Sequence, residues 1–104
     1  MDVAGVTVDD AAVLLDVREP MEWQAGHIAG AVNVPLSQLV ERQGKIPTDR
    51  PILCVCRSGN RSAMVADALA DAGYDARNFD GGMLAWLESG GDVVAADGAP
   101  GRVI

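Results

Sequence analysis

Residues 51–55 form a short apolar run, Pro-Ile-Leu-Cys-Val, that leads directly into a polar loop containing a glycine. A bounding proline and two β-branched residues in so short a run predict a buried strand. Beyond the loop the chain has the period of an amphipathic helix, which Gly73 is placed to end. On its predicted apolar face lie Met64, Val65, Ala68, Leu69 and Ala72. A strand that passes through a tight loop into a helix is the basic step of an α/β fold.

Cys56 is the first residue after this predicted strand, where open α/β sheets place their ligands. We expect the helix to begin near Asn60 or Ser62, so that its unpaired N–H groups and the positive end of its dipole face the thiol. Gly59 allows the loop to curl, and Arg57 and Arg61 add positive charge. This setting lowers a thiol pKa, and the thiolate is the reactive form. A cysteine in a strand is ordinarily inert core, but this loop predicts a catalytic Cys56.

The rest of the chain alternates short apolar runs with helical segments that begin or end at proline and glycine. We predict further strands at 6–8, 13–17, 32–34 and 76–79, and helices at Pro20–Ala25, Gln38–Gln43 with Ser37 as the cap, and Met83–Glu88. Asp9 and Asp10 fit a turn or a brief helix start. Such alternation favours a mostly parallel sheet covered by helices. We expect one domain over residues 1–91 and a loosely packed tail over 92–104.

Net charge and the length of the apolar runs limit which partners and which cellular location we expect. Fifteen acidic against eight basic residues give a net charge of −7, which argues against a nucleic-acid partner or an anionic membrane surface. No apolar run approaches the roughly 18 residues of a membrane span, and the first residues lack a basic segment. We therefore expect no membrane association and a cytoplasmic location.

The two cysteines, Cys54 and Cys56, point to the same side of an extended strand, and a bridge between them would need distortion. With one histidine and a Cys-x-Cys pair, the spacing does not match a structural zinc site. We expect no metal, and we interpret Cys54 as a core residue.

Three separated motifs resemble the single-domain rhodanese family of thiosulfate-type sulfurtransferases. The first comprises Asp16-Val17-Arg18-Glu19, Glu22-Trp23 and residues 26–35 from Gly-His-Ile to Val-Pro; the second is the loop 56–62, Cys-Arg-Ser-Gly-Asn-Arg-Ser; the third is Gly81-Gly82-Met83 with Trp86. The resemblance covers residues 13 to 90. It implies a rhodanese-like α/β fold, with a mostly parallel five-stranded sheet and helices on both faces.

The resemblance also implies a persulfide mechanism. The Cys56 thiolate would take a sulfane sulfur from thiosulfate or another donor and pass it to cyanide or a thiol. The substrate-binding residues would be those of the loop, namely Arg57, Ser58, Gly59, Asn60, Arg61 and Ser62. The implied partners are a small anionic sulfur donor and a thiol or cyanide acceptor, with a protein donor or acceptor as an alternative. No metal or organic cofactor is implied.

The remaining motif residues have structural interpretations. We expect Asp16 and Arg18 to form a hydrogen-bonded pair beside the loop. His27 is a structural signature in this family rather than a base, and Trp23 and Trp86 are interpreted as core or pocket-wall residues. Gly81 and Gly82 fit a tight turn near the active-site mouth.

The chain departs from the family before Val13, where only four residues follow Val8 in place of a full helix. This shortened region and the long tail could each support a dimer interface, but we expect a monomer. Two other functions are considered. Cysteine phosphatases and arsenate reductases use a similar loop with one residue more between cysteine and arginine than the four that separate Cys56 from Arg61. A shorter loop encloses a smaller cavity and favours sulfur over phosphate. The other alternative is a relay or sensing module for protein-to-protein sulfur transfer.

Overall fold

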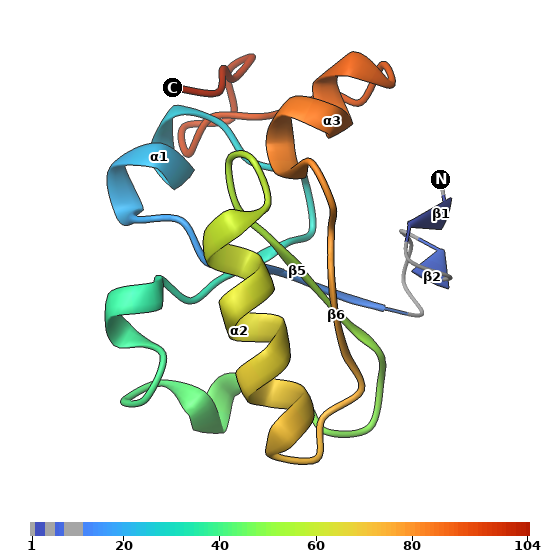
Figure 1. Ribbon diagram of the computed structural model, residues 1–104. Coiled ribbons are helices and arrows are strands. Elements are labelled where there is room, and N and C mark those ends of the chain that lie inside the picture. The colour runs from blue at the N-terminus through green and yellow to red at the C-terminus, as the bar shows by residue number, and fades with distance from the viewer. Residues whose placement is uncertain (1, 4–5, 8–11) are drawn as a thin grey trace.

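The central sheet of this computed structural model has four parallel strands in the order β4-β3-β5-β6. The structure describes residues 2–3, 6–7 and 12–104 (Figure 1). The strands are β3 (Val13–Asp16), β4 (Val32–Asn33), β5 (Ile52–Val55) and β6 (Ala76–Asn78). In the central pair, Leu15 lies opposite Cys54 and Asp16 opposite Val55. Both central strands are buried along their whole length, as the near-continuous apolar runs predicted.

The predicted five-stranded sheet is wrong by one strand. Among the described residues, β2 (Val6–Thr7) pairs antiparallel with β1 (Asp2–Val3) in a separate two-stranded sheet. The reason lies in the connection, because only residues 8–12 separate β2 from β3 and a parallel pair needs a crossover of roughly a dozen residues. Val8 and the predicted turn at Asp9 and Asp10 lie outside the described residues.

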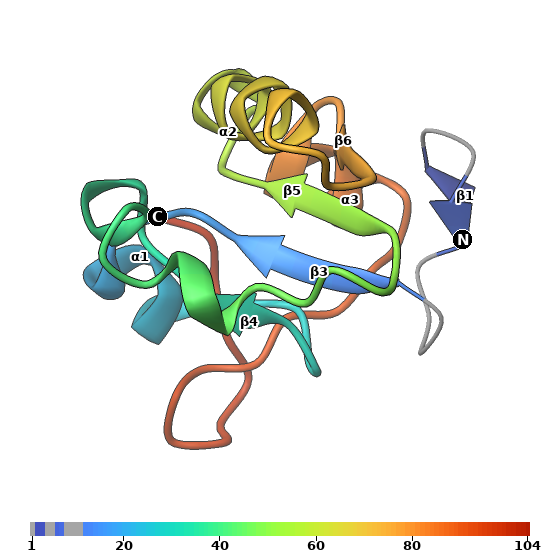
Figure 2. The ribbon, with the colours of Figure 1, turned by 90° about the horizontal axis from the view of Figure 1, so that it is seen from below.

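Helices cover both faces of the sheet, as expected (Figure 2). The sheet therefore separates two hydrophobic clusters, one on each face. On one face α2 (Asn60–Asp71) packs on Leu15 and Cys54; on the other α3 (Gly82–Glu88) packs on Leu14 and Leu53. Because side chains alternate along a strand, Cys54 and Cys56 both belong to the α2 face. This alternation places the catalytic candidate beneath the first turn of α2.

The helix α2 begins at Asn60 as predicted, and Gly73 ends it with a backbone φ of +97°. The N–H of Tyr74 donates to the Leu69 carbonyl at 3.0 Å, closing a Schellman motif. The prediction for its buried face is partly wrong: Met64 is 60% exposed, and Ala68 and Ala72 are exposed too. The buried stripe instead has helical spacing through Ser62, Val65, Ala66 and Leu69. Ser62 can lie on this buried face because its hydroxyl bonds to groups beneath α2.

The helix α1 (Pro20–Ala25) has the predicted bounds, whereas the predicted helix Gln38–Gln43 is wrong. Two 3₁₀ turns stand there, η1 (Leu36–Gln38) and η2 (Gln43–Lys45). The start of this segment is instead tied to the sheet, because the Leu36 N–H donates to the Val17 carbonyl at 3.0 Å. Ser37 does not cap a helix, because its hydroxyl donates to Glu19 Oε1 at 2.8 Å.

The tail, residues 92–104, is packed against the body of the protein, so the expectation of loose packing is wrong. Val94 and His27 exchange two backbone hydrogen bonds of 2.9 Å, and the Arg102 N–H donates to the Ala25 carbonyl at 2.9 Å. Gly26 leaves the room for this contact, since a Cβ there would overlap the backbone of Arg102. Within the described part of the chain, no helix is both long and apolar enough to span a membrane.

Candidate active site

Cys56 stands at the carboxyl end of β5 and is 1% exposed. It is a free thiol, as is Cys54, two residues earlier in the strand. Burial raises the pKa of Cys54 to about 12, so this thiol is protonated at neutral pH. The structure therefore confirms Cys54 as a core residue and leaves Cys56 as the thiol with reactive surroundings.

The sulfur of Cys56 takes the place of a helix cap. Gly59 precedes α2 and has no side chain to satisfy the first-turn N–H groups. Its own N–H donates to Cys56 Sγ at 3.1 Å, and the Ser62 N–H lies 3.4 Å from the same atom. The Ser62 Oγ lies 3.3 Å from it. The loop can close in this way because Gly59 adopts a φ of +106°.

This environment favours the thiolate. Burial alone raises the pKa of Cys56, but the Ser62 hydroxyl and the N–H groups of Ser62, Gly59 and Ser58 together lower it below its ordinary value. This shift has the direction that the sequence analysis predicts.

The opposite side of the loop is held by the first turn of α3. The N–H of Met83 donates to the Cys56 carbonyl at 2.8 Å, and that of Leu84 to the Arg57 carbonyl at 3.1 Å. Gly82 has a φ of +57°, and a Cβ on it would overlap the Cys56 carbonyl oxygen. The interpretation of Gly81 and Gly82 as a tight turn beside the site is confirmed.

Arg61 forms a bidentate ion pair with Glu22 of α1. The distances are 2.6 Å from Nη1 to Oε1 and 2.9 Å from Nη2 to Oε2. The hydrogen bond from Arg61 is the main reason that the pKa of Glu22 is lowered, and Glu22 in turn raises the pKa of Arg61. The guanidinium therefore links α1 to the first turn of α2 with its charge balanced.

The predicted loop residues differ in what they face. Gly59 and Ser62 are buried against the Cys56 sulfur, whereas Ser58 and Asn60 are exposed. Arg57 is also exposed, and its Nε donates to the carbonyl of Ile104 in the tail at 3.1 Å. The tail thus reaches the loop that follows Cys56.

Asp16 and Arg18 form the expected buried pair. Arg18 Nη2 donates to Asp16 Oδ2 at 2.8 Å and to the Gly26 carbonyl at 2.7 Å, with no exposure of the guanidinium. His27 stacks on Trp23 with 3.6 Å between ring centroids, and its Nδ1 lies 2.9 Å from the Trp23 carbonyl. Since that carbonyl is an acceptor, Nδ1 carries the proton. The contacts of all four residues support their structural interpretation.

Asn78 is a site residue that the sequence analysis did not identify. It ends β6, next to β5, and its Oδ1 lies 2.6 Å from Ser62 Oγ. Its Nδ2 donates to Asp80 Oδ1 at 2.9 Å and to the Gly59 carbonyl at 3.3 Å. The available signal was a polar side chain at the carboxyl end of a strand adjacent to the one that carries Cys56.

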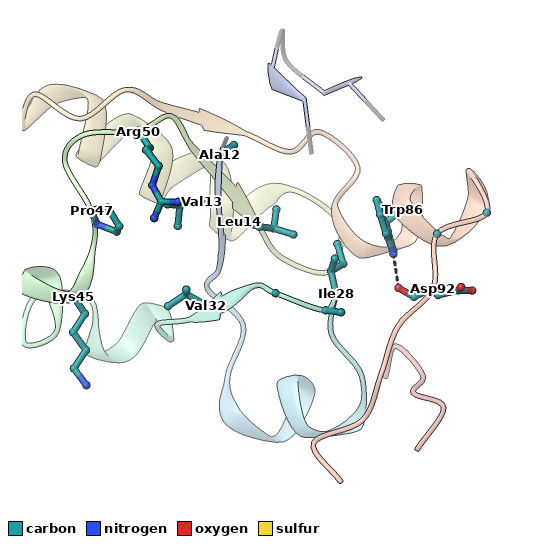
Figure 3. A pocket seen from close by; sticks show the side chains of 14 residues that line it. Ala12, Val13, Leu14, Ile28, Val32, Lys45, Pro47, Arg50, Trp86 and Asp92 are labelled. Atoms are coloured by element: carbon teal, nitrogen blue, oxygen red, sulfur yellow. Dashed lines mark hydrogen bonds between the residues drawn. The ribbon is translucent and has the colours of Figure 1, made fainter. Parts of the chain in front are cut away.

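A cavity of about 830 Å³ lies near the amino ends of β3 and β4, away from the carboxyl end that carries Cys56 (Figure 3). Leu14, Ile28 and Val32 line it. Trp86 borders it as a wall residue, as predicted, with its Nε1 donating to the Asp92 carbonyl at 2.8 Å. No residue of the loop 56–62 is among the described residues that line it. Within the described ranges no three His, Cys, Asp or Glu side chains gather as metal ligands.

Comparison with known proteins identifies relatives of this chain. Residues 5–89 match the family described as rhodanese-like domain. The uncharacterized protein YqhL of Bacillus subtilis is 45% identical over 76 residues, which are 72% of this chain and 60% of YqhL. This chain therefore spans less than two thirds of that relative. A protein named sulfurtransferase from Allochromatium vinosum is 37% identical over 87 residues, 83% of this chain and 81% of its own length.

Solved structures agree with the sequence comparison. The crystal structure of a rhodanese-related protein from Thermoplasma volcanium superposes with a TM-score of 0.77 at 38% identity, covering 81% of this chain and 84% of that one. A match over most of the chain, together with the same fold in solved relatives, establishes the family. This chain belongs to the rhodanese-like domain family.

Proposed function

We propose that this chain is a sulfurtransferase that carries a sulfane sulfur as a persulfide on Cys56. The donor would be thiosulfate or a persulfide, and the acceptor cyanide or a thiol. The observation that carries the proposal is the Cys56 sulfur at the N-terminus of α2, with N–H groups at 3.1 and 3.4 Å. The helix N-terminus and these N–H groups favour the nucleophilic thiolate over the thiol, and the same field would stabilise a second anionic sulfur. Family membership and a sulfurtransferase-named relative support the same chemistry.

The reaction would run as a double displacement. The Cys56 thiolate attacks the outer sulfur of thiosulfate; the S–S bond of thiosulfate breaks, sulfite leaves with the bonding electron pair, and a Cys56 persulfide anion remains. Cyanide then attacks the terminal sulfur, the new S–S bond breaks, and thiocyanate leaves as the thiolate is restored. No net oxidation or proton transfer occurs, so the reaction needs no metal or organic cofactor.

The loop would hold the terminal sulfur of the persulfide by its backbone, over residues 57–62. The first-turn N–H groups of Asn60 and Arg61 have no acceptor among the described residues, so they are open to an anion. Anion binding by the Arg57 and Arg61 side chains stays a prediction. Arg61 would have to act while paired with Glu22, whereas Arg57 would have to share its guanidinium with the tail.

The two rival functions are distinguished by substrate. The four-residue spacing between Cys56 and Arg61, and the balanced charge of Arg61, favour sulfur transfer over phosphate or arsenate chemistry. A protein donor or acceptor, as in a sulfur relay or a sensor, uses the same persulfide. A KM for thiosulfate far above cellular concentrations would favour the protein donor. The cytoplasmic location also stays a prediction.

The test is intact-protein mass spectrometry after incubation with thiosulfate, with Cys56→Ser as the control. We expect the gain of one sulfur atom in the wild type, its absence in the folded variant, and its loss on adding cyanide. If thiosulfate gives no adduct, the same assay is repeated with a low-molecular-weight persulfide. Failure with both donors, or an adduct that persists in Cys56→Ser, would refute the assignment.

A further inference from the structure

The Ser62 hydroxyl has one proton and two acceptors to choose from. Its Oγ lies 2.6 Å from Asn78 Oδ1 and 3.3 Å from Cys56 Sγ. Ser62 is fully buried, so water cannot replace either partner. A buried hydroxyl without an acceptor costs free energy. In every state of the site the Ser62 hydroxyl must therefore donate its hydrogen bond to one of these two groups.

The orientation of the Asn78 amide is fixed by its other contacts. Its Nδ2 faces the Gly59 carbonyl and the Asp80 carboxylate, and both of these groups accept hydrogen bonds only. The amide oxygen must therefore face Ser62. Asn78 Oδ1 also cannot donate, so the proton of this 2.6 Å hydrogen bond belongs to Ser62.

The charge on the sulfur determines whether Asn78 Oδ1 or Cys56 Sγ accepts the hydrogen bond from Ser62. A neutral Cys56 thiol is a weak acceptor and can itself donate to Ser62 Oγ, which leaves the hydroxyl proton for Asn78. A thiolate accepts only, and a hydrogen bond to an ion is roughly twice as strong as a neutral one, so the hydroxyl turns to the sulfur. We propose that Asn78 is a positioning residue that takes the Ser62 proton whenever the inner sulfur of Cys56 carries no charge.

This alternation has a consequence for the proposed reaction cycle, and this part of the inference rests on the proposed function. In the persulfide the negative charge moves to the terminal sulfur, and the inner sulfur becomes a weak acceptor again. The Ser62 hydroxyl would then return to Asn78. By holding the proton in the uncharged states, Asn78 opposes ionisation of the thiol and keeps Ser62 ready for the leaving thiolate.

The charged groups around this cluster come from α1, α2, β3, the loop and the segment after β6. Arg61 on α2 acts on Cys56 through space and is paired with Glu22 on α1, Arg57 adjoins Cys56 in the loop, and Asp80 follows β6. Asp16 at the end of β3 also lies within range of Arg61. These charges set the absolute pKa of Cys56 but are the same in both arms of a comparison that changes only the Ser62 hydroxyl.

The test is a double-mutant cycle on the pH profile of Cys56 alkylation by iodoacetamide, in a Cys54→Ala background. Asn78→Leu removes the acceptor at similar volume, and Ser62→Ala removes the hydroxyl. Asn78→Leu deprives the thiol state of one hydrogen bond, so with Ser62 present we expect the thiolate fraction below the pKa to rise roughly two- to tenfold. In the Ser62→Ala background there is no hydroxyl to bond Asn78, so this rise in the thiolate fraction should be absent.

Asn78→Leu also removes the hydrogen bonds to the Gly59 carbonyl and to Asp80, which are effects common to both backgrounds that the cycle subtracts. If Asn78→Leu does not fold, Asn78→Ala takes its place in the same cycle. The proposal would be overturned if Asn78→Leu changed the Cys56 pKa equally with and without the Ser62 hydroxyl. It would also be overturned if the part of the change that depends on Ser62 were a rise in that pKa. Alkylation needs no sulfur donor, so its result stands apart from that of the thiosulfate assay.

Discussion

Replacing Glu22 by glutamine should destabilise the protein through the ion pair that joins α1 to α2. The glutamine side chain has nearly the same shape but no charge to offer the guanidinium of Arg61, which now bonds both carboxylate oxygens. Glu22 Oε1 also accepts the N–H of Glu19 at the start of α1, at 3.2 Å. The substitution therefore weakens a junction between two helices and leaves the buried strands untouched.

The magnitude follows from the partial burial of the pair. The side chains are 32% exposed for Arg61 and 16% for Glu22. Fully exposed pairs contribute about 0.2 to 1 kcal/mol, while removing one partner of a buried pair costs roughly 3 to 5 kcal/mol. Bidentate geometry at partial burial places this pair between the two, at about 1 to 2 kcal/mol. For a domain of this size that corresponds to a melting temperature lower by roughly 5 to 10 °C.

The assay is urea denaturation of the wild type and Glu22→Gln across pH. The pKa of Glu22 is lowered in the folded protein, so its stabilisation is fully present above the unfolded value and is lost as the pH falls through the folded value. The difference in unfolding free energy should thus be largest at neutral pH and disappear in acid. Glu41→Gln is the matched control, because Glu41 is exposed and has no ion pair among the described residues. A difference that does not change with pH would refute the reasoning.

Three further predictions use the same site. Arg61→Ala removes a positive charge that acts on Cys56, so the pKa of the thiol should rise, as measured by alkylation rates across pH; an unchanged profile would contradict this. Cys54→Ser should retain most sulfur transfer, and inactivity of the folded variant would show a role for that thiol. Gly82→Ala should cost roughly 2 to 4 kcal/mol, because positive φ adds to overlap with the Cys56 carbonyl. Gly98→Ala is its control in denaturation, since Gly98 also has a positive φ but open space around it; equal losses would disprove the overlap.

Elements encoded by local sequence could be predicted, and those set by distant contacts could not. Pro20 begins α1 and Gly73 ends α2, because the fixed φ of proline and the positive φ that glycine allows act within one turn. By contrast, β2 pairs with its hairpin neighbour instead of the sheet, a choice that depends on connection length and not on the apolar pattern. The rotation of α2 was also missed, because a helical wheel treats Ser62 as polar and therefore as exposed.

The same division applies to the site. The place of Cys56 between a strand and a helix start could be predicted because the strand, the glycine and the helix start are contiguous. The ion pair of Arg61 joins residues 39 positions apart, and the contact between Ser62 and Asn78 spans 16. Both depend on which elements lie side by side, and that information comes only with the assembled sheet.

In the loop after Cys56, the backbone carbonyls and the backbone N–H groups point in opposite directions. Its carbonyls at Cys56 and Arg57 face outward to the N–H groups of α3, while its N–H groups at Gly59 and Ser62 face inward to the sulfur. Had the carbonyls turned inward, they would have repelled a thiolate and a persulfide alike. The hydrogen bonds from the Met83 and Leu84 N–H groups therefore have an electrostatic consequence: by fixing the outward direction of the carbonyls, α3 keeps the surroundings of the sulfur positive.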